Sequence, residues 1–206
     1  VSLALDRFLE DLVRRRAEVE TRLCLGASAS DTHSRKNTGM TTKDATRRII
    51  SAAQEAVAAG KKVQVSVQSA FGCGFEGPVP EERVLEMVGA YLDAGLRNIS
   101  LADTAGHACP TQVEQLFAAV LELDPNVECT CHFHNTYGLG MANIMAALRI
   151  GVASFETSFA GLGGCPFTKV AAGNVATEDA ATSDAAASPT PIMSMPASAC
   201  AFAKRR

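Results

Sequence analysis

His132 and His134 are the residues of this sequence whose type and spacing point most directly to chemistry. They lie in the segment Cys-His-Phe-His-Asn-Thr (131–136), at the end of an apolar run that indicates a β-strand. Alternate side chains of a strand point to the same face, so the two imidazoles converge while Phe133 points away. Two imidazoles on a rigid strand can bind one metal ion together. We therefore predict a metal site; the alternative is one polar core histidine and one surface histidine.

Cys129 and Cys131 lie on the same expected strand and raise the alternative of a structural zinc site shared with the histidines. Strand alternation argues against it, because the two cysteines share the face opposite to that of His132 and His134. We expect both thiols to pack against outer helices.

A glycine-rich loop follows the next expected strand, with the sequence Gly-Leu-Gly-Gly-Cys-Pro-Phe (161–167). Glycines let a backbone approach a ligand closely, and Cys165 in such a loop could act as a nucleophile or as an acid or base. The alternative is a plain connection. Further along, Asn174 could offer an amide oxygen to the same metal or could instead cap a helix.

The elements that would position these residues repeat along the chain. Apolar runs indicate strands, and 3.6-residue periodicity indicates a helix between them. The expected strands are 23–25, 63–67, 99–103, 127–134 and 153–160, and the expected helices lie at 5–13, 41–59, from 80, from 110 and at 141–148. This βα alternation is typical of a parallel sheet with helices.

Two α/β architectures fit strict βα alternation, the doubly wound sheet and the (β/α)8 TIM barrel. The sequence has neither a G-x-G-x-x-G fingerprint after an early strand nor a Walker A lysine motif. Polar or glycine-rich residues follow each strand instead, at 28–31, 69–77, 103–106, 132–138 and 161–165. Barrel active sites are built from such positions, which favours a partial TIM barrel with about five of the eight βα units.

The composition is that of an ordinary globular protein of 206 residues, 47% hydrophobic and 20% charged. A net charge of −3 gives no basic field for nucleic acid, and no apolar run is long enough for a membrane helix. Seven cysteines without a signal-peptide layout predict reduced thiols inside a cell. We expect an incomplete barrel domain over 1–180 and a disordered low-complexity tail over 181–206.

Three segments, in this order and spacing, resemble the hydroxymethylglutaryl-CoA lyase family. They are Cys-His-Phe-His-Asn-Thr-Tyr-Gly (131–138), Ala-Gly-Leu-Gly-Gly-Cys-Pro-Phe (160–167) and Gly-Asn-Val-Ala-Thr-Glu-Asp (173–179). Residues 71–77 and 99–106 also resemble loops of that family, so the resemblance covers roughly 23–179. The Gly-Gly-Cys-Pro loop is its specific element, because the other signatures also occur in related synthases of homocitrate or isopropylmalate.

The resemblance implies roles for individual residues. It implies that His132, His134 and Asn174 bind Mg²⁺ or Mn²⁺, that Cys165 is the catalytic cysteine, and that Asp103 assists at the substrate. It implies an acyl-CoA substrate, 3-hydroxy-3-methylglutaryl-CoA, cleaved to acetoacetate and acetyl-CoA. It leaves open a homodimer, and a location in the cytoplasm or the mitochondrial matrix. The alternatives are a Claisen-type acyltransferase and a non-catalytic truncated remnant.

The family's first strand ends in an Arg-Asp pair that holds the substrate carbonyl and the metal, and this chain contains no such segment. We therefore expect a partial chain that lacks the N-terminal strands and has weak or absent activity alone. Coenzyme A also needs cationic partners for its phosphates. His33, Arg35 and Lys36 are candidates, and the alternative is a solvated loop.

Overall fold

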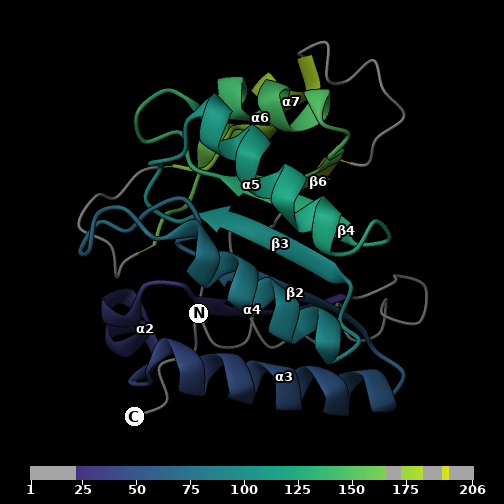
Figure 1. The fold of residues 1–206 in the computed structure, drawn as a ribbon. Helices are drawn as coiled ribbons and strands as arrows, with labels where there is room; N and C mark the ends of the chain where they lie inside the picture. The colour runs from purple at the N-terminus through teal and green to yellow at the C-terminus, as the bar shows by residue number, and fades with distance from the viewer. Residues whose placement is uncertain (1–21, 166–172, 183–191, 195–206) are drawn as a thin grey trace, which may run out of the picture.

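The computed structural model describes residues 22–165, 173–182 and 192–194, and in them the chain forms one parallel sheet with helices (Figure 1). The strands lie in the sheet in the same order as in the sequence. They are β1 (Arg22–Ser28), β2 (Lys62–Gln68), β3 (Asn98–Asp103), β4 (Glu128–Phe133), β5 (Ser154–Thr157) and β6 (Ile192–Ser194). All five pairings are parallel, as the βα alternation predicts.

The helices connect successive strands, and the longer ones lie side by side along the sheet (Figure 1). They are α2 (Asp31–Thr38), α3 (Thr42–Ala58), α4 (Glu81–Asp93), α5 (Pro110–Leu123), α6 (Gly140–Arg149), the short 3₁₀ helix η1 (Phe159–Gly161) and α7 (Thr177–Thr182). A sheet that adds one parallel strand after each helix is the repeating unit of a (β/α)8 barrel.

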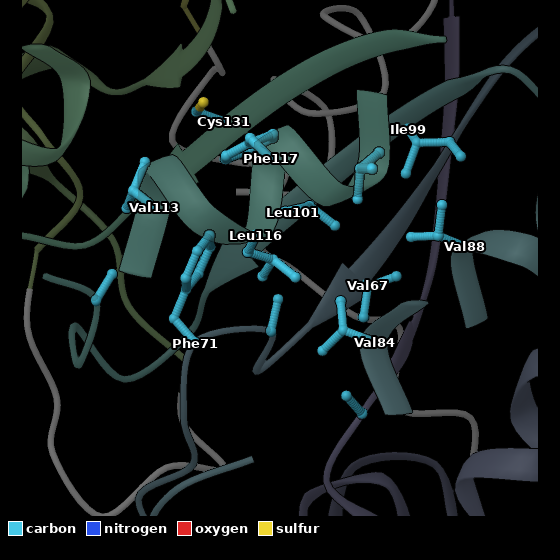
Figure 2. Packing of buried hydrophobic residues seen from close by; sticks show 14 of the residues in the cluster. Val67, Phe71, Val84, Val88, Ile99, Leu101, Val113, Leu116, Phe117 and Cys131 are labelled. Carbon is cyan, nitrogen blue, oxygen red and sulfur yellow. The ribbon is translucent and has the colours of Figure 1, made fainter. Parts of the chain in front are cut away.

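One face of the sheet packs against the helices and forms the hydrophobic core (Figure 2). Phe71, from the loop after β2, lies 6.1 Å from the ring of Phe117 on α5 and 5.8 Å from that of Phe133 on β4. Cys131 is buried in this cluster and Cys129 packs against it. Both cysteines therefore face away from the histidines, as strand alternation predicts.

The opposite face of the sheet is polar and hydrogen-bonded across strands. The Cys24 thiol lies 3.4 Å from Gln64 Oε1, and Gln64 Nε2 donates to Thr130 Oγ1 at 3.0 Å. The Thr130 hydroxyl in turn donates to Ser154 Oγ at 3.2 Å. This chain of contacts joins β1, β2, β4 and β5, and it places polar side chains on the face that carries His132.

Two elements differ from the sequence-based expectation. Residues 31–38 form α2, because the Ser30 hydroxyl accepts a hydrogen bond from His33 N and caps a helix that has no apolar periodicity to reveal it. Residues 192–194, inside the segment expected to be a disordered tail, form β6 and pair with β5. Three residues are too few for a strand pattern. The helix expected at 5–13 and the rest of the tail lie outside the described residues.

Within the described segments, no helix is both long enough and apolar enough to cross a membrane.

Candidate active site

The candidate site lies where the loops after β3, β4 and β5 meet, at the carboxyl ends of the strands. His132 and His134 lie on the same face, with ring centroids 5.2 Å apart and ring planes at 61°. Phe133 between them is buried in the hydrophobic core. The structure therefore brings the two imidazoles together, as their spacing predicts.

His134 is held by a backbone group of the loop after β3. Its Nδ1 lies 2.9 Å from the Thr104 carbonyl oxygen, which can only accept, so Nδ1 is the donor. Burial, and after it the nearby His132, lower the pKa of His134 to about 4, and the contacts with Thr104 and Asn174 oppose both effects. The ring is therefore neutral at pH 7, and its Nε2 lone pair is free to bind a metal.

Asn174 lies directly beside His134, to which it is joined by an antiparallel bridge. Its side-chain Nδ2 donates to the Leu162 carbonyl at 2.8 Å, while its Oδ1 is buried without a hydrogen-bond partner. A buried carbonyl oxygen without a donor can accept from a water or bind a cation. The structure thus places Asn174 beside His134, and its role as a ligand stays a prediction.

The predicted donor set would consist of two imidazoles and one amide oxygen. In the ranges that the structure describes, no three His, Cys, Asp or Glu side chains cluster around a common point. Donors of mixed N and O type would suit a divalent cation that also binds oxygen atoms of a substrate.

Glu156, which the sequence analysis did not single out, lies beside His132. It is the β5 residue in register with His132, and its Oε2 is 2.8 Å from His132 Nδ1. A carboxylate at one imidazole nitrogen orients the ring and increases the electron density on the other nitrogen. The signal was present in the sequence, as one acidic residue within an apolar strand, but its partner lies on a neighbouring strand.

We predict that Glu156→Gln weakens metal binding by about 10- to 100-fold, because the ring of His132 loses its charged orienting partner. Isothermal titration calorimetry with Mn²⁺ would measure the dissociation constant. Glu86→Gln, a change of the same type at an exposed position on α4, is the matched control. Equal affinities for the two variants would contradict the prediction.

Asp103, the last residue of β3, is fully buried and holds the loop that follows it. Its two carboxylate oxygens accept hydrogen bonds from the backbone N–H groups of His107 at 2.8 Å and Ala108 at 3.1 Å. Burial raises the pKa of Asp103 to about 6, although these hydrogen bonds and His132 oppose the shift. The loop carries the Thr104 carbonyl that fixes His134. A role for Asp103 at the substrate stays a prediction.

The raised pKa of Asp103 predicts how stability depends on pH. Its folded pKa of about 6 lies above the ordinary value of 3.8, so the folded state binds the proton more tightly. This contribution to stability is present below about pH 4 and decreases by ~3 kcal/mol as the pH rises to about 6 and beyond. Asp103→Asn removes this pH dependence.

Urea unfolding of both proteins between pH 4 and pH 7 would measure this. The free energy of unfolding of the wild type should fall relative to that of Asp103→Asn as the pH rises. Because the difference between the two proteins is measured, the titration of His134 contributes to both and cancels. A difference that does not change with pH would rule out a raised pKa at Asp103.

Cys165, the predicted catalytic cysteine, lies at the end of the glycine-rich loop, and its Sγ is 3.4 Å from Nε2 of His33 on α2. His33 is therefore buried in a protein contact and does not face solvent as a phosphate ligand would. Arg35 and Lys36 are more exposed: Arg35 pairs with Asp31, and the Lys36 ammonium lies 5.0 Å from the Phe75 ring centroid.

The glycines let the loop lie against the segment that carries Asn174. Gly161 has a positive φ of 65°, and a Cβ there would come within 2.8 Å of the Asn174 carbonyl oxygen. Gly163 has a φ of 110°, and its Cβ would meet Asn174 Nδ2 at 2.8 Å. Only glycine fits either position, so these residues place the Cys165 loop beside the candidate metal ligands.

Parallel βα units with polar side chains gathered at the carboxyl ends of the strands define a protein of the TIM-barrel class. Comparison with protein families identifies it more closely. The chain belongs to the HMGL-like family, whose model matches residues 7–191.

Individual relatives agree with this assignment. The chain is 38% identical over 156 residues to a hydroxymethylglutaryl-CoA lyase of Bacillus subtilis, covering 76% of this chain and 52% of the relative. It is 46% identical over 115 residues to an (R)-citramalyl-CoA lyase of Chloroflexus aurantiacus. That match covers 56% of this chain and 36% of the relative. The chain thus spans about half the length, or less, of these curated relatives.

Solved structures show the same partial match. An HMG-CoA lyase from Acinetobacter baumannii, in complex with coenzyme A and 3-methylmalate, superposes with a TM-score of 0.70 at 41% identity over 77% of this chain and 52% of that one. The Bacillus subtilis HMG-CoA lyase superposes with a TM-score of 0.73 at 37% identity, and the match covers 78% of this chain and 54% of that one. The predicted partial TIM barrel and the family resemblance are both confirmed. The division at residue 180 stays a prediction.

Proposed function

We propose that this chain carries the site of a metal-dependent carbon–carbon lyase that cleaves 3-hydroxy-3-methylglutaryl-CoA to acetoacetate and acetyl-CoA. The observation that carries the proposal is that His132, His134 and Asn174 converge beside the Cys165 loop. The relatives named as hydroxymethylglutaryl-CoA lyases support the substrate.

Members of the HMGL-like family generally depend on a divalent metal. His132, His134 and Asn174 would hold the metal ion here, and we propose that the ion is Mg²⁺ or Mn²⁺. The buried Asn174 Oδ1 without a donor and the neutral His134 ring fit a cation. The bound ion would supply Lewis-acid polarisation of the substrate's tertiary hydroxyl and carboxylate oxygens.

The chemistry requires two proton movements. The tertiary hydroxyl proton passes to a water molecule that acts as the base, and that carbon–oxygen bond becomes the ketone of acetoacetate. The neighbouring carbon–carbon bond breaks, and its electron pair passes to the thioester enolate of acetyl-CoA. Cys165 then donates its thiol proton to the enolate carbon, which completes acetyl-CoA.

Other residues would prepare the site for these steps. Glu156 orients His132, and Asp103 holds the loop whose Thr104 carbonyl orients His134. The glycine-rich loop packs on the Asn174 segment and would exclude water from the enolate. We assign the substrate to the acyl-CoA class, supported by the coenzyme A bound in the Acinetobacter baumannii structure.

A second candidate substrate is (R)-citramalyl-CoA, because the named relative shares 46% identity over 115 residues with this chain. Its cleavage breaks the same type of bond next to a tertiary hydroxyl but gives pyruvate in place of acetoacetate. The same side chains would serve both reactions.

The test is an assay of the purified chain with Mg²⁺ or Mn²⁺ and hydroxymethylglutaryl-CoA. We expect slow release of acetoacetate, abolished in Cys165→Ala and kept in Cys24→Ala, which removes an exposed thiol. Pyruvate from citramalyl-CoA alone would favour the second substrate. Acetyl-CoA-dependent condensation with a 2-oxo acid would indicate an acyltransferase. Absence of both turnover and metal binding would overturn the proposal in favour of a non-catalytic remnant.

A further inference from the structure

A buried histidine contacts the predicted catalytic cysteine from the opposite end of the described sheet. His33 Nε2 and Cys165 Sγ lie 3.4 Å apart although the residues are 132 positions apart in the chain. His33 is only 1% exposed, and its other ring nitrogen, Nδ1, has no hydrogen-bond partner among the described residues. Among the described residues, the side-chain ring of His33 therefore has its polar contact with the Cys165 sulfur.

The ring of His33 is held in place by the start of α2. The Ser30 hydroxyl accepts from His33 N at 3.1 Å, and Ser30 N donates to Ser28 Oγ, at the end of β1, at 3.1 Å. These two hydrogen bonds fix the first turn of α2 to the carboxyl end of β1. His33 consequently approaches Cys165 from an ordered element, whereas Cys165 lies in a glycine-rich loop.

Burial keeps the ring of His33 neutral, against the effect of a nearby carboxylate. Burial lowers the pKa of His33, and the Glu76 carboxylate, which accepts from Thr32 N, opposes the shift. Glu76 is itself neutralised in part by Arg83 on α4, at 3.6 Å. On α2 itself, Asp31 and Arg35 pair with each other in a more exposed position.

A neutral imidazole carries one N–H, and the position of that proton decides what it does for the thiol. With the hydrogen on Nε2, the ring donates to the sulfur and stabilises the charge that appears when the thiol loses its proton. We propose that His33 is the positioning residue of Cys165, holding its sulfur at the site and donating Nε2–H to the thiolate.

This inference rests on the proposed function and adds a partner to its proton-donating step. The thiol proton goes to the enolate carbon, the sulfur keeps the electron pair, and the Nε2–H proton stays on His33. Solvent then returns a proton to the sulfur. Other thiols lack such help: burial raises the pKa of Cys129 to about 12, and the partial burial of the more exposed Cys24 raises its pKa as well.

The test uses alkylation of Cys165 and needs no substrate, so it is independent of turnover. Trypsin releases residues 150–169, which contain Cys165 as their one cysteine, and residues 23–35, which contain Cys24 alone. Mass spectrometry of these peptides after iodoacetamide pulses at different pH values gives a separate thiolate profile for each cysteine.

In the full wild-type chain, we expect the Cys165 midpoint to lie below the ordinary thiol value of ~8.5. In His33→Phe, which keeps the ring volume without a donor, it should rise by about one pH unit. His33→Gln, which keeps an N–H donor, should restore part of the shift. The Cys24 midpoint should be the same in all three proteins.

Two results would overturn the proposal. One is an unchanged Cys165 midpoint in His33→Phe, and the other is an equal shift at Cys24, which would indicate general loosening of the fold. If His33→Phe does not fold, the wild type decides alone, since a Cys165 midpoint at or above that of Cys24 contradicts a stabilised thiolate. Absence of lyase turnover with a lowered Cys165 midpoint would count against the proposed function only.

Discussion

Replacing His134 with alanine should abolish metal binding by this chain, with a loss of affinity of more than about 100-fold. Removing a residue that only orients a metal ligand already lowers metal affinity by about 10- to 100-fold, and His134 is proposed to be a ligand itself. Its ring is neutral at pH 7 and its Nδ1 is committed to the Thr104 carbonyl, so Nε2 has no described role other than binding. Calorimetry with Mn²⁺ measures the affinity, and the lyase assay should show no turnover.

His107→Ala is the control for His134→Ala. His107 is half-buried and stacks on Tyr137 at 5.8 Å, so its removal should leave metal affinity unchanged. His134→Gln, which keeps more of the buried volume, separates loss of the ligand from loss of packing. Retained affinity in both His134 variants would show that the cation binds elsewhere.

Replacing Gly106 with alanine should destabilise the protein by about 2–5 kcal/mol, as a left-handed backbone and a steric clash combine. Gly106 has a φ of 74°, and a Cβ there would overlap the side chain of Thr136 and lie 3.2 Å from its backbone nitrogen. The loops after β3 and β4 meet at this point. Urea unfolding would measure the loss, and metal affinity should fall with it.

Gly138→Ala separates the two causes. Gly138 has a φ of 76°, nearly that of Gly106, but no atom lies within 4 Å of the position of its Cβ. Gly138→Ala should lower the free energy of unfolding by only ~1–2 kcal/mol, because only the left-handed backbone conformation disfavours alanine there. Equal losses in the two variants would mean that the loops do not touch at Gly106.

The sequence predicts the parts of this molecule that depend on local periodicity. Alternation along one strand was enough to place His132 and His134 on one face and Cys131 on the other. The βα period was likewise enough to predict parallel neighbours. Asn174 was a candidate ligand from its place in a loop, a role that the family resemblance also implies, and its contact with His134 depends on a bridge between distant segments.

The residues that sequence reasoning missed act through partners far away in the chain. Glu156 is informative only once β5 is placed in register beside His132. His33 was considered as a phosphate ligand because it follows the first expected strand, with a solvated loop as the alternative, whereas the Ser30 cap starts a helix in which His33 is buried. Such contacts follow from the packing of elements, which no periodicity within one element encodes.

The identical order of the strands in the sheet and in the sequence has a consequence for how this chain folds. Each pairing closes over one βα unit, so no strand must wait for a distant segment before it finds its neighbour. Sheet formation can therefore advance unit by unit from the N-terminal side during synthesis, with β1 and β2 pairing before β4 has left the ribosome. The contact between His33 on α2 and Cys165, in the loop after β5, joins the two ends of that order and can form only once the β5 unit is in place.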